Sequence, residues 1–313
     1  QQIIRKNNPI YDVVDQYCFY SKNVYNQANY IIRQEFINNN NELSAYDVQK
    51  LMQSMDCYKE CGSQAAQKTI QLVDKMWKSY FKAIKDWKKN PSKYLGMPKL
   101  PKYLPKDGRQ VFMLKNIQCS LNNGQFRIAF KPFGGYTVKT HAEGKLMQCR
   151  FVPKADYYVM EIVYKIEVPE TENIVSERIA AIDLGVDNLM TITTNCDVSP
   201  IIINGKPLKS INQYYNEKIS EMRSALKLRN DSDWSNEMQR FTTKRNNQVD
   251  DYIQKSTKMV VNFCKCNNID TLVCGYNSGW KQDTNMGKRV NQKFVAIPYL
   301  SIVQRLEYKC ENE

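Results

Sequence analysis

Histidine and closely spaced cysteine pairs are almost missing from this sequence of 313 residues. His141 is the only histidine and lies in a polar turn, and none of the ten cysteines forms a C-x-x-C pair. Cys57 and Cys61 are spaced to share one face of a helix, but a tetrahedral zinc site would need two further soft ligands. The pattern therefore indicates reduced thiols in a reducing compartment and gives His141 no catalytic role.

Long apolar runs are missing as well. No segment approaches the roughly 18 apolar residues of a membrane span, and no apolar stretch follows Arg5 and Lys6 as in a secretory signal. Only 12 glycines and 11 prolines occur, whereas 42% of the residues are apolar, which favours a folded chain with a substantial core. We expect a cytoplasmic protein. The start at Gln1 and the helix-like final segment favour a fragment that lacks its C-terminal part.

The common enzyme motifs are also lacking. The sequence contains no Walker-type loop, no G-x-G-x-x-G, no G-x-S-x-G and no H-E-x-x-H. Nucleotide hydrolysis by a P-loop, dinucleotide binding and zinc proteolysis thus lose their usual sequence support.

Positive charge is concentrated in one quarter of the chain. The net charge is +13, and the segment from Lys75 to Arg150 holds 17 Lys and Arg against three acids. The remainder is nearly neutral. A localised excess of this kind is typical of a surface that binds a polyanion, although a merely solvated basic face is the alternative.

A helix is predicted inside this basic segment. Apolar residues recur at intervals of three and four from Ile70 to Trp87, and these aromatics are expected to face the core. A row of lysines follows the same period on another face: Lys75, Lys78, Lys82, Lys85 and Lys89. Neighbouring ammonium groups repel one another unless phosphates lie along them. Four prolines then mark an extended basic linker that carries Lys99 and Lys102.

The patterns change twice along the chain. Residues 1–108 are mostly helical and end in the basic linker, whereas 109–175 hold short β-rich runs between turn signals and predict a small antiparallel barrel or sheet, which strands from the N-terminus could join. Residues 176–313 show three strands, two long helical stretches (208–231 and 236–268), a buried strand and a terminal helix. That order predicts an α/β domain with a mixed sheet.

An acidic residue ends the first strand of the last domain. The apolar run before Asp183 is followed by Gly185, which permits a tight turn into a second strand. Hard Mg²⁺ prefers carboxylate oxygen, and ribonuclease-H-like nucleases present an acid in this way. Taken alone, the residues from Asp183 to Gly185 form a weak motif that is more often an ordinary Asp-Gly turn.

A longer set of residues resembles a known family. The segments AAIDLGVDNLMTITTN, PIIINGKPLKSINQYYNEKISEMRS and VCGYNSGWKQDTNMGKRVNQKFVAIPY are similar to the TnpB/OrfB proteins of transposons, which are related to type V CRISPR effectors. SKNVYNQANYIIRQEF and the basic linker region resemble that family too. The resemblance extends over nearly the whole chain.

This resemblance implies a multidomain α+β fold with a helical recognition lobe, a small wedge-like β-barrel and a ribonuclease H/RuvC-like domain. It implies an RNA-guided DNA endonuclease, with guide RNA and double-stranded target DNA as partners and no membrane partner. Base pairing would read the target, and the protein would read a short adjacent motif. Mg²⁺ or Mn²⁺ would be the cofactor.

The sequence departs from the family in its acids. Asp183 matches the first of three metal-binding acids, but Gly275 stands where the second commonly is a glutamate. A compensating glutamate, the third acid and the family's zinc ribbon would all lie beyond residue 313, and only there would Zn²⁺ bind. We therefore expect the chain as given to be inactive as a nuclease. The alternative function is a nuclease-inactive, repressor-like RNA-guided DNA binder, and a generic RNA-binding protein leaves Asp183 unexplained.

Further candidates follow the resemblance. A Gly-punctuated loop is suited to phosphate contacts through Trp280, Lys281, Lys288 and Arg289, with a solvated loop as the alternative. Asp187 would support the metal site indirectly or simply stabilise the turn. Asn212 and Asn216 are expected to order the start of a helix near that site, or to serve as caps or surface residues.

Overall fold

The computed structural model describes residues 1–313 except 168–176, 231–232, 278 and 282–286, and except the side chains of Asn230, Lys288 and Arg289. The chain forms two compact units, residues 1–169 and 170–313. None of the described helices is long and apolar enough to cross a membrane.

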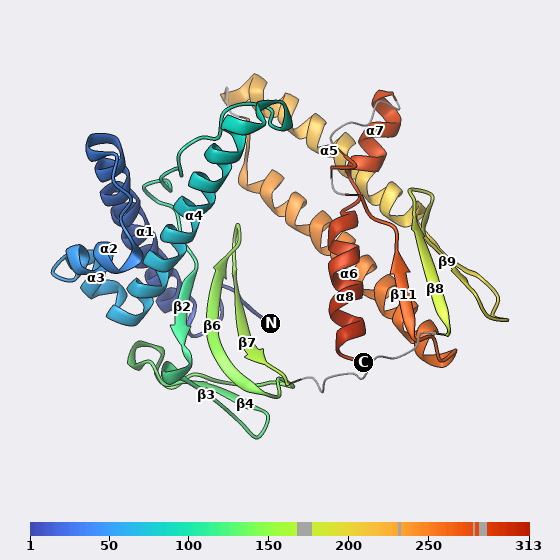
Figure 1. Ribbon diagram of the computed structural model, residues 1–313, viewed down its shortest axis with the longest axis horizontal. Coiled ribbons are helices and arrows are strands. Elements are labelled where there is room, and N and C mark those ends of the chain that lie inside the picture. The colour runs from blue at the N-terminus through green and yellow to red at the C-terminus, as the bar shows by residue number, and fades with distance from the viewer. Residues whose placement is uncertain (168–176, 231–232, 278, 282–286) are drawn as a thin grey trace. The chain divides into compact units, whose positions relative to one another are not determined.

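Four helices build one part of the first unit (Figure 1): α1 (Tyr11–Asn39), α2 (Ala45–Met52), α3 (Asp56–Cys61) and α4 (Ser63–Lys89). Helix α4 packs along α1, and the Trp77 indole N–H donates a hydrogen bond to Asn29 Oδ1 at 2.9 Å. Trp77 is only 2% exposed. The helical periodicity and the inward position of this aromatic residue are therefore as the sequence predicts.

Two antiparallel sheets complete the first unit. One has the order β1–β7–β6–β2, with β1 (Gln2–Ile4), β7 (Tyr158–Lys165), β6 (Lys145–Pro153) and β2 (Phe112–Lys115). The other has the order β3–β4–β5, with β3 (Cys119–Asn122), β4 (Gln125–Ile128) and β5 (Thr137–Lys139). An N-terminal strand thus joins strands from the predicted β-rich segment. Phe112, Phe133 and Phe151 stack between these strands and the helices, so helices and sheets share one core.

A mixed sheet organises the second unit. Its order is β10–β9–β8–β11, with β8 (Ile179–Leu184), β9 (Asn188–Thr194), β10 (Ile201–Asn204) and β11 (Thr271–Cys274). The first three strands pair antiparallel, and β11 runs parallel to β8. The described helices are α5 (Lys206–Asn230), α6 (Asn236–Cys266), α7 (Lys288–Val295) and α8 (Tyr299–Glu311).

Alternation along β8 decides which side chains are buried. Ala180, Ile182 and Leu184 belong to the core that includes residues of α6 and α8, whereas Asp183 is exposed. Since successive side chains of a strand point to opposite faces, Asp183 lies on the face away from that core. The sequence order had predicted both the mixed sheet and this apolar strand.

Candidate functional site

Asp183 lies near the carboxyl end of β8, opposite Thr191 of β9. The following turn requires a glycine at position 185, because a Cβ there would lie 2.6 Å from the Asn188 carbonyl oxygen. Gly205, just before α5, is equally constrained: its Cβ would lie 2.0 Å from the Val186 oxygen. Two glycines thus allow the β8–β9 hairpin and the start of α5 to approach closely beside Asp183.

The residue beside Asp183 on the neighbouring strand has no side chain. Cys274 is in register with Ile182, and the Gly275 N–H donates to the Ile182 carbonyl oxygen at 3.3 Å. Gly275, the residue after Cys274, therefore lies next to Asp183 on the neighbouring strand. Throughout the described part of the chain, no group of three or more His, Cys, Asp and Glu side chains could hold a metal ion. Asp183 alone does not fit the carboxylate set that two-metal phosphodiester cleavage requires.

Asp187, at the tip of the same hairpin, forms an ion pair with Lys209 of α5 at 2.7 Å. Hydrogen bonding from Lys209, with weaker attraction from Lys293 and Lys206, lowers the pKa of the Asp187 carboxyl below its ordinary value. A backbone bond at 2.7 Å from Gly205 N–H to the Asp187 oxygen adds a second link. Asp187 therefore connects the hairpin to α5.

The predicted row of lysines lies along α4. All five members (Lys75, Lys78, Lys82, Lys85 and Lys89) are exposed. Lys78 forms an ion pair with Asp74 at 2.8 Å, and no other member forms an ion pair with a described residue. The helix thus carries closely spaced, largely uncompensated ammonium groups, as a phosphate-binding surface requires.

The basic linker is held along α1 by side chains that sequence reasoning did not identify. Asn26 makes two bonds to the backbone of Leu104, donating from Nδ2 at 3.0 Å and accepting at Oδ1 at 2.8 Å. Lys22 donates to the Lys106 carbonyl at 2.7 Å. Further bonds reach Lys102 and Pro101: Tyr25 Oη to Lys102 O, and Asn29 and Arg33 to Pro101 O.

These bonds engage the linker backbone and leave the side chains of Lys99 and Lys102 exposed. The signal in the sequence was present but ambiguous: polar residues recur at intervals of three and four on α1 between Lys22 and Arg33. A polar stripe of that kind looks like a solvated face until the linker is seen to lie on it.

Trp280 and Lys281 have partners within the second unit. The Trp280 ring lies against Phe294 and Tyr299. Lys281 Nζ donates to the carbonyl oxygen of Val295 at 2.8 Å and to that of Ile297, and burial lowers its pKa. These contacts account for both side chains without a phosphate, so their assignment to a nucleic-acid surface stays a prediction. The backbone of Lys288 and Arg289 begins α7, but their side chains lie outside the described part of the chain.

The expectation that Asn212 and Asn216 order the start of α5 is wrong, because the helix begins at Lys206 and both residues lie within it. Asn212 is buried, and its Oδ1 accepts hydrogen bonds from Nε of Arg245 on α6 at 2.8 Å and from Nη2. The hydrogen bonds from Arg245 explain why a buried asparagine is found inside this helix, and no local sequence pattern reveals Arg245 as the partner.

Comparison with known proteins gives one family match and two matches to solved structures. The family model OrfB_IS605, described as "Probable transposase", matches residues 161–281. The solved Cas12f1–sgRNA–target DNA complex has a protein chain similar to this one, with a TM-score of 0.56, 14% identity, and coverage of 96% of this chain and 71% of that chain. A CRISPR-Cas12f ternary complex also matches, with a TM-score of 0.34, 14% identity, and coverage of 96% and 69%. No curated protein matches. The mixed α+β fold is thus shared with Cas12f1.

Proposed function

We propose that this chain is a TnpB-like protein of the OrfB family and that it binds a guide RNA and, through it, double-stranded target DNA. The row of exposed lysines on α4 carries the proposal, because such a row is unfavourable without a polyanion beside it. The solved Cas12f1 complex contains sgRNA and target DNA, and the same two ligands are proposed here.

The basic linker supports the same partner. Side chains of α1 bind its backbone, so Lys99 and Lys102 extend from a held segment rather than from a free loop. Holding the backbone in place lowers the entropy lost when these side chains meet phosphates. We assign the lysine row and the linker to the guide RNA backbone, with base pairing reading the DNA sequence.

We propose three domains within this function: a helical recognition region over 1–108, a wedge-like barrel over 109–175 and a RuvC-like domain over 176–313. The antiparallel β8–β9–β10 strands with parallel β11 beside β8 support the last of these. Asp183 would be the acid of that domain that binds a divalent metal.

Two activities are compatible with guided binding. Cleavage of the target next to a short motif, with Mg²⁺ or Mn²⁺, needs more carboxylates than the described residues bring to Asp183. Occupancy of the DNA without cleavage needs none. The described residues favour occupancy, and a cleavage assay with Mg²⁺ and Mn²⁺ on guide-matched DNA separates the two.

RNA binding is tested with a 20-base-pair RNA hairpin and a variant in which the five lysines of α4 are replaced by Gln. If about four phosphates are neutralised there, log affinity of the wild type falls with log salt at a slope of roughly −3, and the variant loses most of that slope. The control replaces five ion-paired lysines of the second unit by Gln: Lys218, Lys227, Lys255, Lys258 and Lys265. Equal slopes for the two variants would refute the assignment.

A further inference from the structure

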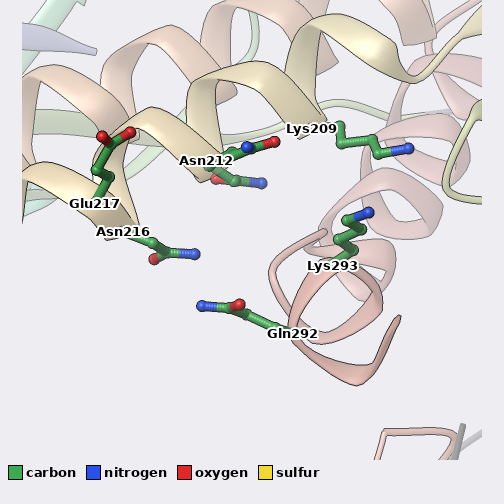
Figure 2. Close-up of a pocket in the computed structure, with 7 residues that line it drawn as sticks. Lys209, Asn212, Asn216, Glu217, Gln292 and Lys293 are labelled. Carbon is green, nitrogen blue, oxygen red and sulfur yellow. The ribbon is translucent and has the colours of Figure 1, made fainter. Parts of the chain in front are cut away.

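A pocket between α5 and α7 has no role in the function described so far. Its volume is about 570 Å³, within the range of sites for small ligands. Every described residue that lines it is polar or charged (Figure 2): Lys209, Asn212, Gln213, Asn216, Glu217, Gln292 and Lys293. Lys209 also pairs with Asp187, so the pocket adjoins the β8–β9 hairpin that carries Asp183.

The pocket is polarised. Figure 2 shows Lys209 and Lys293 together at one end and Glu217 at the other, with Asn216 and Gln292 facing each other between them. At the lysine end, Lys206 attracts the Asp187 carboxylate as Lys209 and Lys293 do, so three ammonium groups are set against one carboxylate. That end therefore favours an anion, whereas the Glu217 carboxylate favours a hydrogen-bond donor.

One lining amide is held in a fixed orientation. Asn212 is 5% exposed, and its Oδ1 accepts from the Arg245 guanidinium, which leaves Nδ2 to donate to a ligand. Arg245 in turn lies over the Tyr215 ring, with 5.4 Å between guanidinium carbon and ring centroid. A buried, oriented amide between the cationic and acidic ends is typical of a site that recognises one chemical group.

We infer that this pocket binds one unstacked nucleotide of a nucleic-acid strand, with its phosphate at Lys209 and Lys293 and its base edge toward the amides and Glu217. An ionised carboxylate only accepts hydrogen bonds, so Glu217 selects bases with an exocyclic amino group. It disfavours thymine and uracil, because their N3–H donor lies between two carbonyl oxygens that repel the carboxylate. The inference rests on the proposed function, because it requires a strand to run beside the β8–β9 hairpin.

The test measures binding of the full chain to ten-nucleotide homopolymers of dA, dC and dT and to their RNA counterparts by fluorescence anisotropy. Lys293→Gln removes one phosphate contact, so affinity falls several-fold for every oligomer and the salt slope falls by about 0.7. Glu217→Gln reduces the preference for adenine and cytosine over thymine by about tenfold, because an amide is a weaker acceptor and also a donor. Lys227→Gln on the same helix is the control, since Lys227 does not line the pocket.

The comparison of DNA with RNA oligomers tells which strand the pocket holds: tighter DNA binding identifies the target strand, and tighter RNA binding identifies the guide. Wild-type affinities that do not distinguish dT from dA and dC, or a Glu217→Gln variant with unchanged preference, would overturn the inference. If the RNA hairpin still binds with its steep salt slope in that case, the proposed function stands and only the pocket assignment fails. If the wild-type chain does not bind the RNA hairpin, both the proposed function and the pocket assignment fail.

Discussion

Gly275 lies beside Asp183 across the parallel pairing of β8 and β11, so the position next to the exposed carboxylate carries no side chain. A Cβ at Gly275 would meet nothing closer than the Ile182 carbonyl oxygen, at 3.9 Å. Adjacent strands are about 4.8 Å apart. A glutamate would therefore fit at this position and bring a second carboxylate next to the first.

We predict that Gly275→Glu creates a divalent-metal site with Asp183. Two carboxylates bind a hard cation better than one, so affinity for Mn²⁺ should rise by about tenfold or more, measured by the electron paramagnetic resonance signal of free Mn²⁺. Gly275→Gln has the same size without the charge and should leave the affinity at the wild-type value. A gain that persists in the Gly275→Glu, Asp183→Asn double variant would show that Asp183 is not part of the site.

A half-buried network in the first unit predicts a pH-dependent stability. Asp15 accepts hydrogen bonds from Arg109 at 2.7 and 2.9 Å and from the Tyr158 hydroxyl at 2.5 Å, and the Arg109 contact lowers the pKa of Asp15 below 3.8. A carboxyl group whose pKa is depressed in the folded state adds stability at pH values above its ordinary pKa. This contribution is lost as the pH falls through the depressed pKa.

Asp15→Asn should therefore cost about 1–2 kcal/mol of unfolding free energy at pH 7, measured by urea denaturation. The difference from the wild type should shrink as the pH falls below about 3.8, the ordinary value of an aspartate. Asp12→Asn, an exposed change on the same helix, serves as the control. A difference for Asp15→Asn that stays constant from pH 7 to pH 3 would contradict this account of the network.

The attachment of the basic linker to α1 depends strongly on Asn26. Replacing Asn26 by Ala leaves both the N–H and the C=O of Leu104 without their partner, which should release the linker locally. We expect trypsin to cut after Lys102 or Lys106 about five to ten times faster, as followed by mass spectrometry. Gln16→Ala removes a bond to Tyr20 on α1 only and should not change the rate. Equal rates in all three proteins would mean that these bonds do not hold the linker.

The sequence predicts local features well when one period explains them. Trp77 belongs to an apolar stripe of spacing three and four, and Ile182 to an alternating strand that ends in a glycine turn, so helix and hairpin follow from neighbours in the chain. The lysine row on α4 is predicted for the same reason.

Contacts across long separations were not predictable in this way. Asn26 and Leu104 are 78 residues apart, and Asn212 and Arg245 are 33 apart, so neither side chain shows its partner in any local pattern. The neighbourhood of Gly275 and Asp183 likewise depends on the register of β11 on β8, which is set by the folded sheet. The resemblance to a known family suggested which positions matter, and only the pairing places them side by side.

The most direct test of the central claim is whether an RNA sets the DNA preference of the chain. The full chain is purified from cells that express it from its natural locus, and the RNA that copurifies is sequenced. Two DNA duplexes are then made: one matches a single-stranded stretch of that RNA, and the other has a scrambled sequence. Target binding is measured by anisotropy before and after ribonuclease treatment. Guided binding predicts at least tenfold tighter binding to the matching duplex and loss of this preference after ribonuclease treatment. Equal affinity for the two duplexes, or a preference that survives removal of the RNA, would contradict it.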